Sequence, residues 1–68
     1  MNDRVYRVIE LIGSSSESWE KAAENAVKEA SKNYTDLRVA EVVEMDVLIE
    51  SGAVIAFRTK LRLSFKQG

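Results

Sequence analysis

The sequence of 68 residues contains neither cysteine nor histidine. Without cysteine the chain has no disulfide and no thiolate ligand, and without histidine it has no imidazole ligand for a metal. The same absences remove the commonest general base and the best nucleophile, which argues against an enzyme. A metal would have to be held by oxygen atoms alone, which is the ligand set of hard cations such as calcium.

An excess of charge of one sign and a long apolar run are also missing. Ten basic and eleven acidic side chains give a net charge of −1, so nothing points to nucleic acid as a partner. No apolar run approaches the ~20 residues of a membrane span, and no membrane partner is expected. The opening residues, 1–4, lack the basic region and apolar core of a signal peptide, so a cytoplasmic location is expected.

The chain is also short, and residues 1–68 are expected to form a single domain. A domain of this size buries only roughly 60% of the surface that its unfolded chain exposes, so its folded state is only marginally stable as a single chain. Small scaffolds usually add disulfides, a metal or oligomerisation. With disulfides excluded, self-association is the expected source of the missing burial.

A strand followed by a helix is predicted for the first half of the chain. Residues 5–12 are rich in β-branched residues, and Gly13 with the serines after it is expected to end the strand. Ser15 or Ser16 is expected to cap the helix N-terminus, with anion binding there as the alternative. The helix is predicted to close at Asn33 in the left-handed conformation.

The helix carries one apolar stripe of period 3.6. Its members are Trp19, Ala22, Ala23, Ala26, Val27 and Ala30. Because most of them are alanines, the helix can lie close to whatever it covers. Trp19, at the start of the stripe, is expected to anchor the helix to a sheet.

Two long strands are predicted for residues 37–50 and 53–66, joined by a tight turn at Ser51-Gly52. The element order β-α-β-β makes this an α+β fold. The crossover rule makes the first and second strands parallel, with the third between them. We therefore predict a three-stranded antiparallel sheet wrapped on one helix.

The strand of residues 37–50 is apolar on both faces, with Val39, Val43 and Val47 on one and Ala40 and Val42 on the other. A strand with one solvated face should be polar on that face. One helix cannot cover both sides of a sheet, so the second cover is expected to be another subunit.

A hairpin in which Glu50 pairs with Ala53 places Glu41 opposite Arg62 and Met45 opposite Arg58. The same register turns Glu44 and Asp46 toward the helix, opposite Thr59 and Phe57. Buried acids there would be costly, so a bulge is expected in the first hairpin strand.

The last strand alternates apolar residues with basic ones, and its basic face carries Arg58, Lys60 and Arg62. This face is expected to pair with acids, with a lumen for phosphate-bearing ligands as the alternative. The acids available are Glu10, Glu41, Glu44 and Asp46. We interpret them as ion-pair partners, with cation ligation as the alternative.

Nearly the whole chain resembles the dodecins. The similarity is carried, in order and without large gaps, by residues 5–15, 18–22, 25–27, 37–44 and 57–66. The resemblance implies a β-α-β-β subunit assembled into a hollow homododecamer that binds and stores flavin, FMN or riboflavin, without catalysis. It also implies a cofactor-binding site around Arg38, Val39, Ala40 and Arg58.

Position 39 departs from the family pattern. The flavin-stacking tryptophan of the dodecins lies just after the Leu-Arg pair, where this chain has Val39. Valine has no aromatic face for an isoalloxazine ring. Arg58 stands where some members have a glutamine that contacts the ring edge. A branch of dodecin-like proteins with valine here is associated with calcium. The alternative is therefore a shell of the same architecture that does not bind flavin and instead holds a cation such as calcium or serves another ligand.

Overall fold

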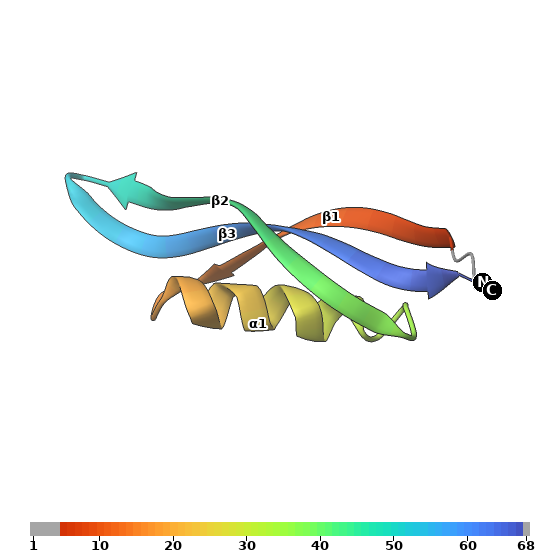
Figure 1. Cartoon of the computed structure of the whole chain (residues 1–68). Helices are drawn as coiled ribbons and strands as arrows, with labels where there is room; N and C mark the ends of the chain where they lie inside the picture. Colours follow the sequence, from red (N-terminus) through yellow and green to blue (C-terminus); the bar gives the residue numbers. More distant parts are fainter. Residues whose placement is uncertain (1–4, 68) are drawn as a thin grey trace.

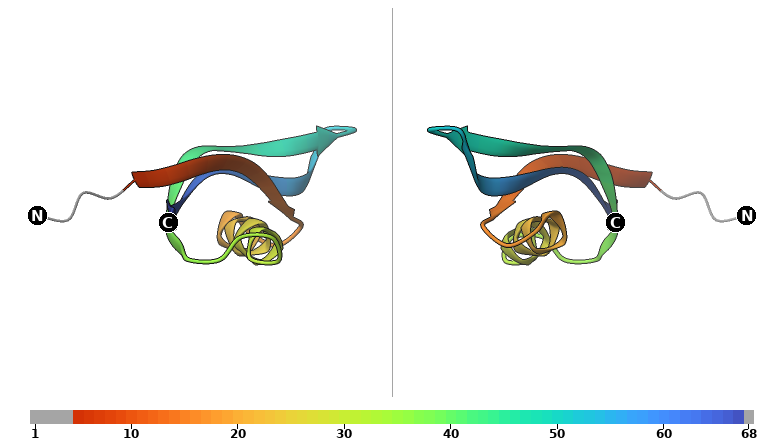
Figure 2. Two further views of the ribbon diagram at one scale, coloured as in Figure 1. Left: turned by 90° about the vertical axis from the view of Figure 1, so that its right-hand side faces the viewer. Right: turned by 90° about the vertical axis from the view of Figure 1, so that its left-hand side faces the viewer.

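The computed structural model describes residues 5–67, which form three strands and one helix. The elements are β1 (Val5–Ser15), α1 (Trp19–Ala30), β2 (Leu37–Glu50) and β3 (Ala53–Gln67). The strands form one sheet in the order β1-β3-β2, and β3 is antiparallel to both neighbours. Figure 1 shows the sheet lying over α1, and the end-on views of Figure 2 show it curving around one side of the helix. The predicted α+β fold and strand order are confirmed.

β1 is longer than the sequence predicted, because Gly13 does not end it. The strand continues to Ser15, and Gly13 pairs with Thr59 inside the ladder. Gly13 is buried where α1 crosses β1. A Cβ atom there would collide with the carbonyl oxygen of Ala22 and lie 3.0 Å from the Cβ of Ala26. The glycine therefore allows the helix and the strand to approach closely. A glycine within a strand often occurs where another backbone comes this near.

Both predicted helix caps were placed wrongly. Ser18 caps the N-terminus, where its hydroxyl accepts a hydrogen bond of 3.0 Å from the backbone N–H of Lys21. The Ser15 hydroxyl instead accepts from Glu17, within the turn that precedes the helix. At the other end Ser31 closes the helix in the right-handed conformation, and the backbone N–H of Asn33 bonds to Ala30. The left-handed residue of this connection is Asp36, with φ of 57°.

The core lies between the alanine stripe of α1 and the apolar face of β3. Its buried members are Ala22, Ala26, Ala30, Thr59, Leu61 and Leu63. The Thr59 hydroxyl donates a hydrogen bond to the carbonyl oxygen of Trp19. Because alanine side chains are small, the helix axis lies close to the sheet. The helix therefore buries this face of β3 although its own side chains are short.

Trp19 contacts the sheet as predicted but is not fully buried. Its indole N–H donates to the carbonyl oxygen of Asp46 at 3.0 Å, and its ring meets Phe57 edge-on at a centroid distance of 5.0 Å. The side chain nevertheless stays 37% exposed in the single chain. It anchors the first turn of α1 to both hairpin strands.

The helix packs on β1 and β3 and leaves β2 largely uncovered. Val39, Val42 and Met45 are each more than half exposed, although they lie on opposite faces of the strand. The expectation that one helix cannot cover this strand is thus confirmed for the single chain. Within residues 5–67 no helix has the length and apolar character needed to cross a membrane.

Candidate functional site

A bulge in β2 sets the chemistry of the sheet face that points away from α1, called the outer face here. Val42 pairs with Leu61, but the next pair is Glu44 with Lys60, so Val43 is the extra residue. The predicted bulge is confirmed. The shift by one residue places Asp46 opposite Arg58, whereas Met45 lies opposite Thr59 on the helix side. The expected pairing of Met45 with Arg58 is therefore wrong. That register, counted from the turn, omitted an irregularity between Leu48 and Ile49, where Ile55 is the extra residue of β3.

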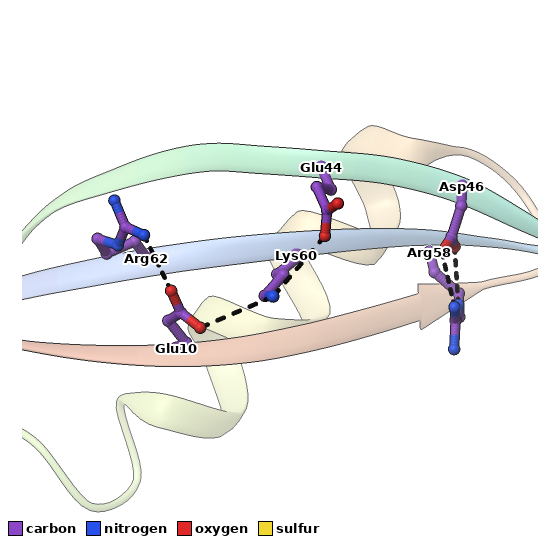
Figure 3. A network of polar contacts seen from close by, with 6 residues as sticks. All are labelled: Glu10, Glu44, Asp46, Arg58, Lys60 and Arg62. Carbon is purple, nitrogen blue, oxygen red and sulfur yellow. Dashed lines mark hydrogen bonds and ion pairs between the residues drawn. The ribbon is translucent and has the colours of Figure 1, made fainter.

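Acids of the two flanking strands pair with the bases of β3 along the outer face (Figure 3). Glu10 lies 3.0 Å from Arg62 and 3.8 Å from Lys60. From the other side, Glu41 lies 3.6 Å from Arg62, and Glu44 lies 3.7 Å from Lys60. The ion-pair interpretation of these acids is confirmed within one chain.

The tightest contact of the outer face joins Asp46 to Arg58. Both guanidinium contacts are short, with Nε to Oδ1 at 2.7 Å and Nη2 to Oδ2 at 2.6 Å. The hydrogen bonds from Arg58 lower the pKa of Asp46 below its ordinary value, and those to Asp46 raise the pKa of Arg58. A bidentate pair fixes both groups more firmly than the longer contacts do. Sequence reasoning missed this pair because the pair lies between two register irregularities, at Ile55 of β3 and at Val43 of β2, and only a bulge in β2 was expected.

These ion pairs specify the register more than they add stability. Their side chains are 35% to 70% exposed, and exposed pairs are typically worth about 0–1 kcal/mol. A slip of β2 by one residue would turn Glu44 and Asp46 toward the helix side, where no base of β3 points. The alternation of charge therefore disfavours the unbulged hairpin.

The Asp46–Arg58 pair predicts an acid-dependent loss of stability. A carboxyl whose folded pKa is depressed contributes stability above its unfolded pKa, about 3.9, and loses it as the pH falls through the folded value. Asp46→Asn should therefore flatten the dependence of unfolding free energy on pH from about pH 5 downwards. Arg58→Gln should flatten it equally, because it removes the same two bonds. Urea titrations at several pH values measure both, and slopes identical to wild type in both variants would contradict the assignment.

The residues expected to bind a cofactor lie in two separate places. Val39 pairs with Ser64 on the outer face and is 59% exposed, while Ala40 pairs with Leu63 on the helix side. Arg38 is the extra residue of a second irregularity in β2. Arg58 lies six residues along β3 from Ser64, about 20 Å at the rise of a strand. One chain thus brings Arg38, Val39 and Ala40 together but not Arg58, and their binding role stays a prediction.

An apolar groove runs between α1 and the helix side of β2, and we call it the helix–strand groove. Its volume is about 430 Å³. Its lining consists of Ala23, Glu24, Val27, Lys28, Ala40, Val42 and Leu61. The sequence predicted that β2 needs a second cover but not this groove, because the pattern does not tell which strands the helix leaves free.

No three carboxylates of residues 5–67 converge closely enough in one chain to hold a metal ion. Glu10, Glu44 and Asp46 each face a base of β3 instead of one another. A cation site built from the outer face would therefore need carboxylates of more than one chain.

Known proteins of similar sequence identify the family of this chain. The sequence profile of the dodecin family matches residues 5–67. The chain belongs to the dodecin family. It is 48% identical over 62 residues to calcium dodecin of Mycobacterium tuberculosis, covering 91% of this chain and 87% of that protein. Dodecins are binding proteins and not enzymes. Membership in this family implies that the chain forms a homo-oligomer that binds small ligands.

Solved dodecin structures share the fold closely. Dodecin from Streptomyces coelicolor superposes with a TM-score of 0.93 at 34% identity, covering 100% of this chain and 97% of that one. The calcium dodecin of M. tuberculosis, described with a novel calcium-binding site, gives 0.84 at 46% identity, covering 94% and 91%. The backbone of this chain is thus more similar to that of the S. coelicolor dodecin, whereas its sequence is more similar to that of the M. tuberculosis calcium dodecin. The shared backbone alone does not determine which ligand is recognised, because recognition depends on the side chains at the site.

Proposed function

We propose that this dodecin is a non-enzymatic homo-oligomeric shell, a dodecamer, that holds calcium and not flavin. The observation that carries the choice of ligand is Val39. Val39 lies on the outer face, at the position where flavin binding would need an aromatic side chain. The chain that carries this valine is 48% identical to a calcium dodecin. Valine provides no stacking surface, and offset stacking adds about 0.5–1.5 kcal/mol for each aromatic pair beyond the area buried.

The state of Arg58 supports the same choice. Both contacting nitrogens of its guanidinium are held by Asp46 at 2.6 Å and 2.7 Å, so a flavin ring edge or a phosphate would compete with an existing carboxylate. Breaking a bidentate pair to free the arginine costs binding energy that a preformed site would not lose.

Carboxylates for a hard cation are present on the outer face. Glu41 and Glu44 are 61% and 70% exposed, and each contacts a base only at 3.6–3.7 Å, so their oxygens remain accessible. Calcium takes six to eight oxygen ligands in flexible geometry, which side chains from neighbouring subunits and water can supply. Glu41 and Glu44 are the ligands we propose, contributed by more than one chain.

Titration of the metal-free oligomer with calcium, and separately with FMN and riboflavin, tests this proposal. We expect calcium to bind, with weaker binding of magnesium, which demands near-ideal octahedral geometry. Glu41→Gln and Glu44→Gln should each weaken calcium binding. Glu29→Gln, which alters an exposed helix carboxylate 3.1 Å from Lys32, is the matched control. Undiminished calcium binding in both outer-face variants would contradict the ligand assignment, and flavin binding without calcium binding would contradict the function.

Val39→Trp should create affinity for flavin where the native chain has little. One added aromatic pair predicts about two- to tenfold tighter binding of both FMN and riboflavin, because the ring and not the phosphate is recognised. Quenching of flavin fluorescence measures it. Val8→Trp is the matched control, since Val8 lies on the outer face of β1 and is 52% exposed against 59% for Val39. An equal gain in both variants would show that position 39 has no special role.

A further inference from the structure

The end of the β2–β3 hairpin has no cover in the single chain. β1 ends at the pair Ser15–Phe57, so residues 48–56 form a ribbon of only two strands, which we call the hairpin arm. Figure 1 shows the arm reaching past the end of α1. Its exposed apolar side chains are Leu48 (39%), Ile49 (67%), Val54 (52%) and Ile55 (46%). A two-stranded ribbon is marginally stable at best in water, so this arm needs a partner.

The helix–strand groove is a second surface that needs a partner. Its floor and walls are apolar, from Ala23, Val27, Ala40, Val42 and Leu61, and only Glu24 and Lys28 add charge. Lys28 forms no ion pair within residues 5–67, and neither does Glu50, the one charged residue of the arm. The two surfaces are thus apolar, and each carries an unpaired charge opposite in sign to that of the other.

A chain cannot fill its own groove with its own arm. Val42 and Ile49 lie on the same strand seven residues apart, about 23 Å at the rise of a β-strand. The chain is elongated, with a long dimension of 55 Å, and the arm extends away from the helix (Figure 2). The partner of each surface must therefore come from outside the chain.

We propose that the hairpin arm of one subunit lies in the helix–strand groove of the next. The proposal rests on the self-association included in the proposed function and specifies the contact that builds it. A second copy fits because each chain carries both halves of the contact in equal number. An arm-to-groove contact joins two different surfaces, so it closes either by reciprocal exchange of arms between two chains or as a ring of three or more chains.

Two substitutions test the two halves separately. Ile49→Arg places a charge on the arm, and Val42→Arg places one in the groove. Both side chains are more than half exposed in the single chain, so the fold should survive, which circular dichroism checks. Light scattering should show each variant as a smaller species than wild type. Val8→Arg is the control, because Val8 is as exposed as Val42 at 52% but lies on the outer face of β1, outside arm and groove.

Mixing the two folded variants gives the decisive measurement. The intact arm of Val42→Arg can enter the intact groove of Ile49→Arg, so the equimolar mixture should contain larger species than either variant alone. A contact of arm with arm, or of groove with groove, predicts no such gain. A mixture no larger than its components, or variants that keep the wild-type size, would overturn the proposal. Wild-type protein that is monomeric would overturn self-association as well, whereas an assembled wild-type protein that binds no calcium would overturn the proposed ligand and leave this contact standing.

Discussion

Gly13→Ala is expected to destabilise the fold by about 3 kcal/mol or more, at the upper end of what overpacking a core costs. The added methyl group would collide with the carbonyl oxygen of Ala22 and lie 3.0 Å from the Cβ of Ala26. The first of these contacts is with helix backbone, which cannot yield as a flexible side chain can. α1 would have to move away from β1, and the packing of its alanine stripe would be lost along the whole helix.

Gly52→Ala is the matched control, because it adds the same methyl group at a glycine with different constraints. Gly52 lies in the hairpin turn with φ of 80°, and nothing lies within 4 Å of an added Cβ atom. The cost there is conformational alone, roughly 1–2 kcal/mol for a left-handed non-glycine residue. Thermal or urea unfolding compares the two variants. A smaller loss at Gly13 than at Gly52 would show that helix and strand are not in contact at this point.

Alternation along the strands was enough to predict the architecture. The regular pattern of β3 defined its two faces, and the two-sided apolar pattern of β2 indicated that one helix would not suffice. The bulge followed from electrostatics, because Glu44 and Asp46 would otherwise face the core. Gly13 was misinterpreted because a glycine followed by serines is the usual end of a strand, whereas its role as a contact point depends on where the helix lies.

The candidate site was harder to predict than the fold. The β2 partner of Arg62 was predictable from a simple register, but that of Arg58 was not, because the part of β2 that faces Arg58 lies between two register irregularities. The pairing of Asp46 with Arg58 and the groove beside Val42 both depend on tertiary placement. The proposed choice of calcium over flavin, by contrast, rests first on the side chain at position 39. The sequence alone shows that side chain to depart from the family pattern.

Leu61→Ala is expected to cost about 2–5 kcal/mol, the range for deleting a buried leucine side chain. Leu61 is 1% exposed and packs beneath the alanine stripe of α1. A domain of 68 residues has a total stability of about 3–10 kcal/mol at 0.05–0.15 kcal/mol per residue. The substitution therefore removes a large share of that stability. It should do so at every protein concentration, because the side chain is already buried within one chain.

Leu48→Ala makes the same chemical change on the hairpin arm, where the leucine is 39% exposed in one chain. At concentrations that favour separate chains its cost should be small, within about 0.5 kcal/mol for a surface substitution. At concentrations that favour assembly the cost should rise, because burial against a neighbour would then be lost, and assembly makes melting temperatures depend on concentration. Melting curves of wild type and both variants at a dilute and a concentrated condition measure the difference. A Leu48→Ala deficit that does not change with concentration would argue that this side chain meets no neighbouring subunit.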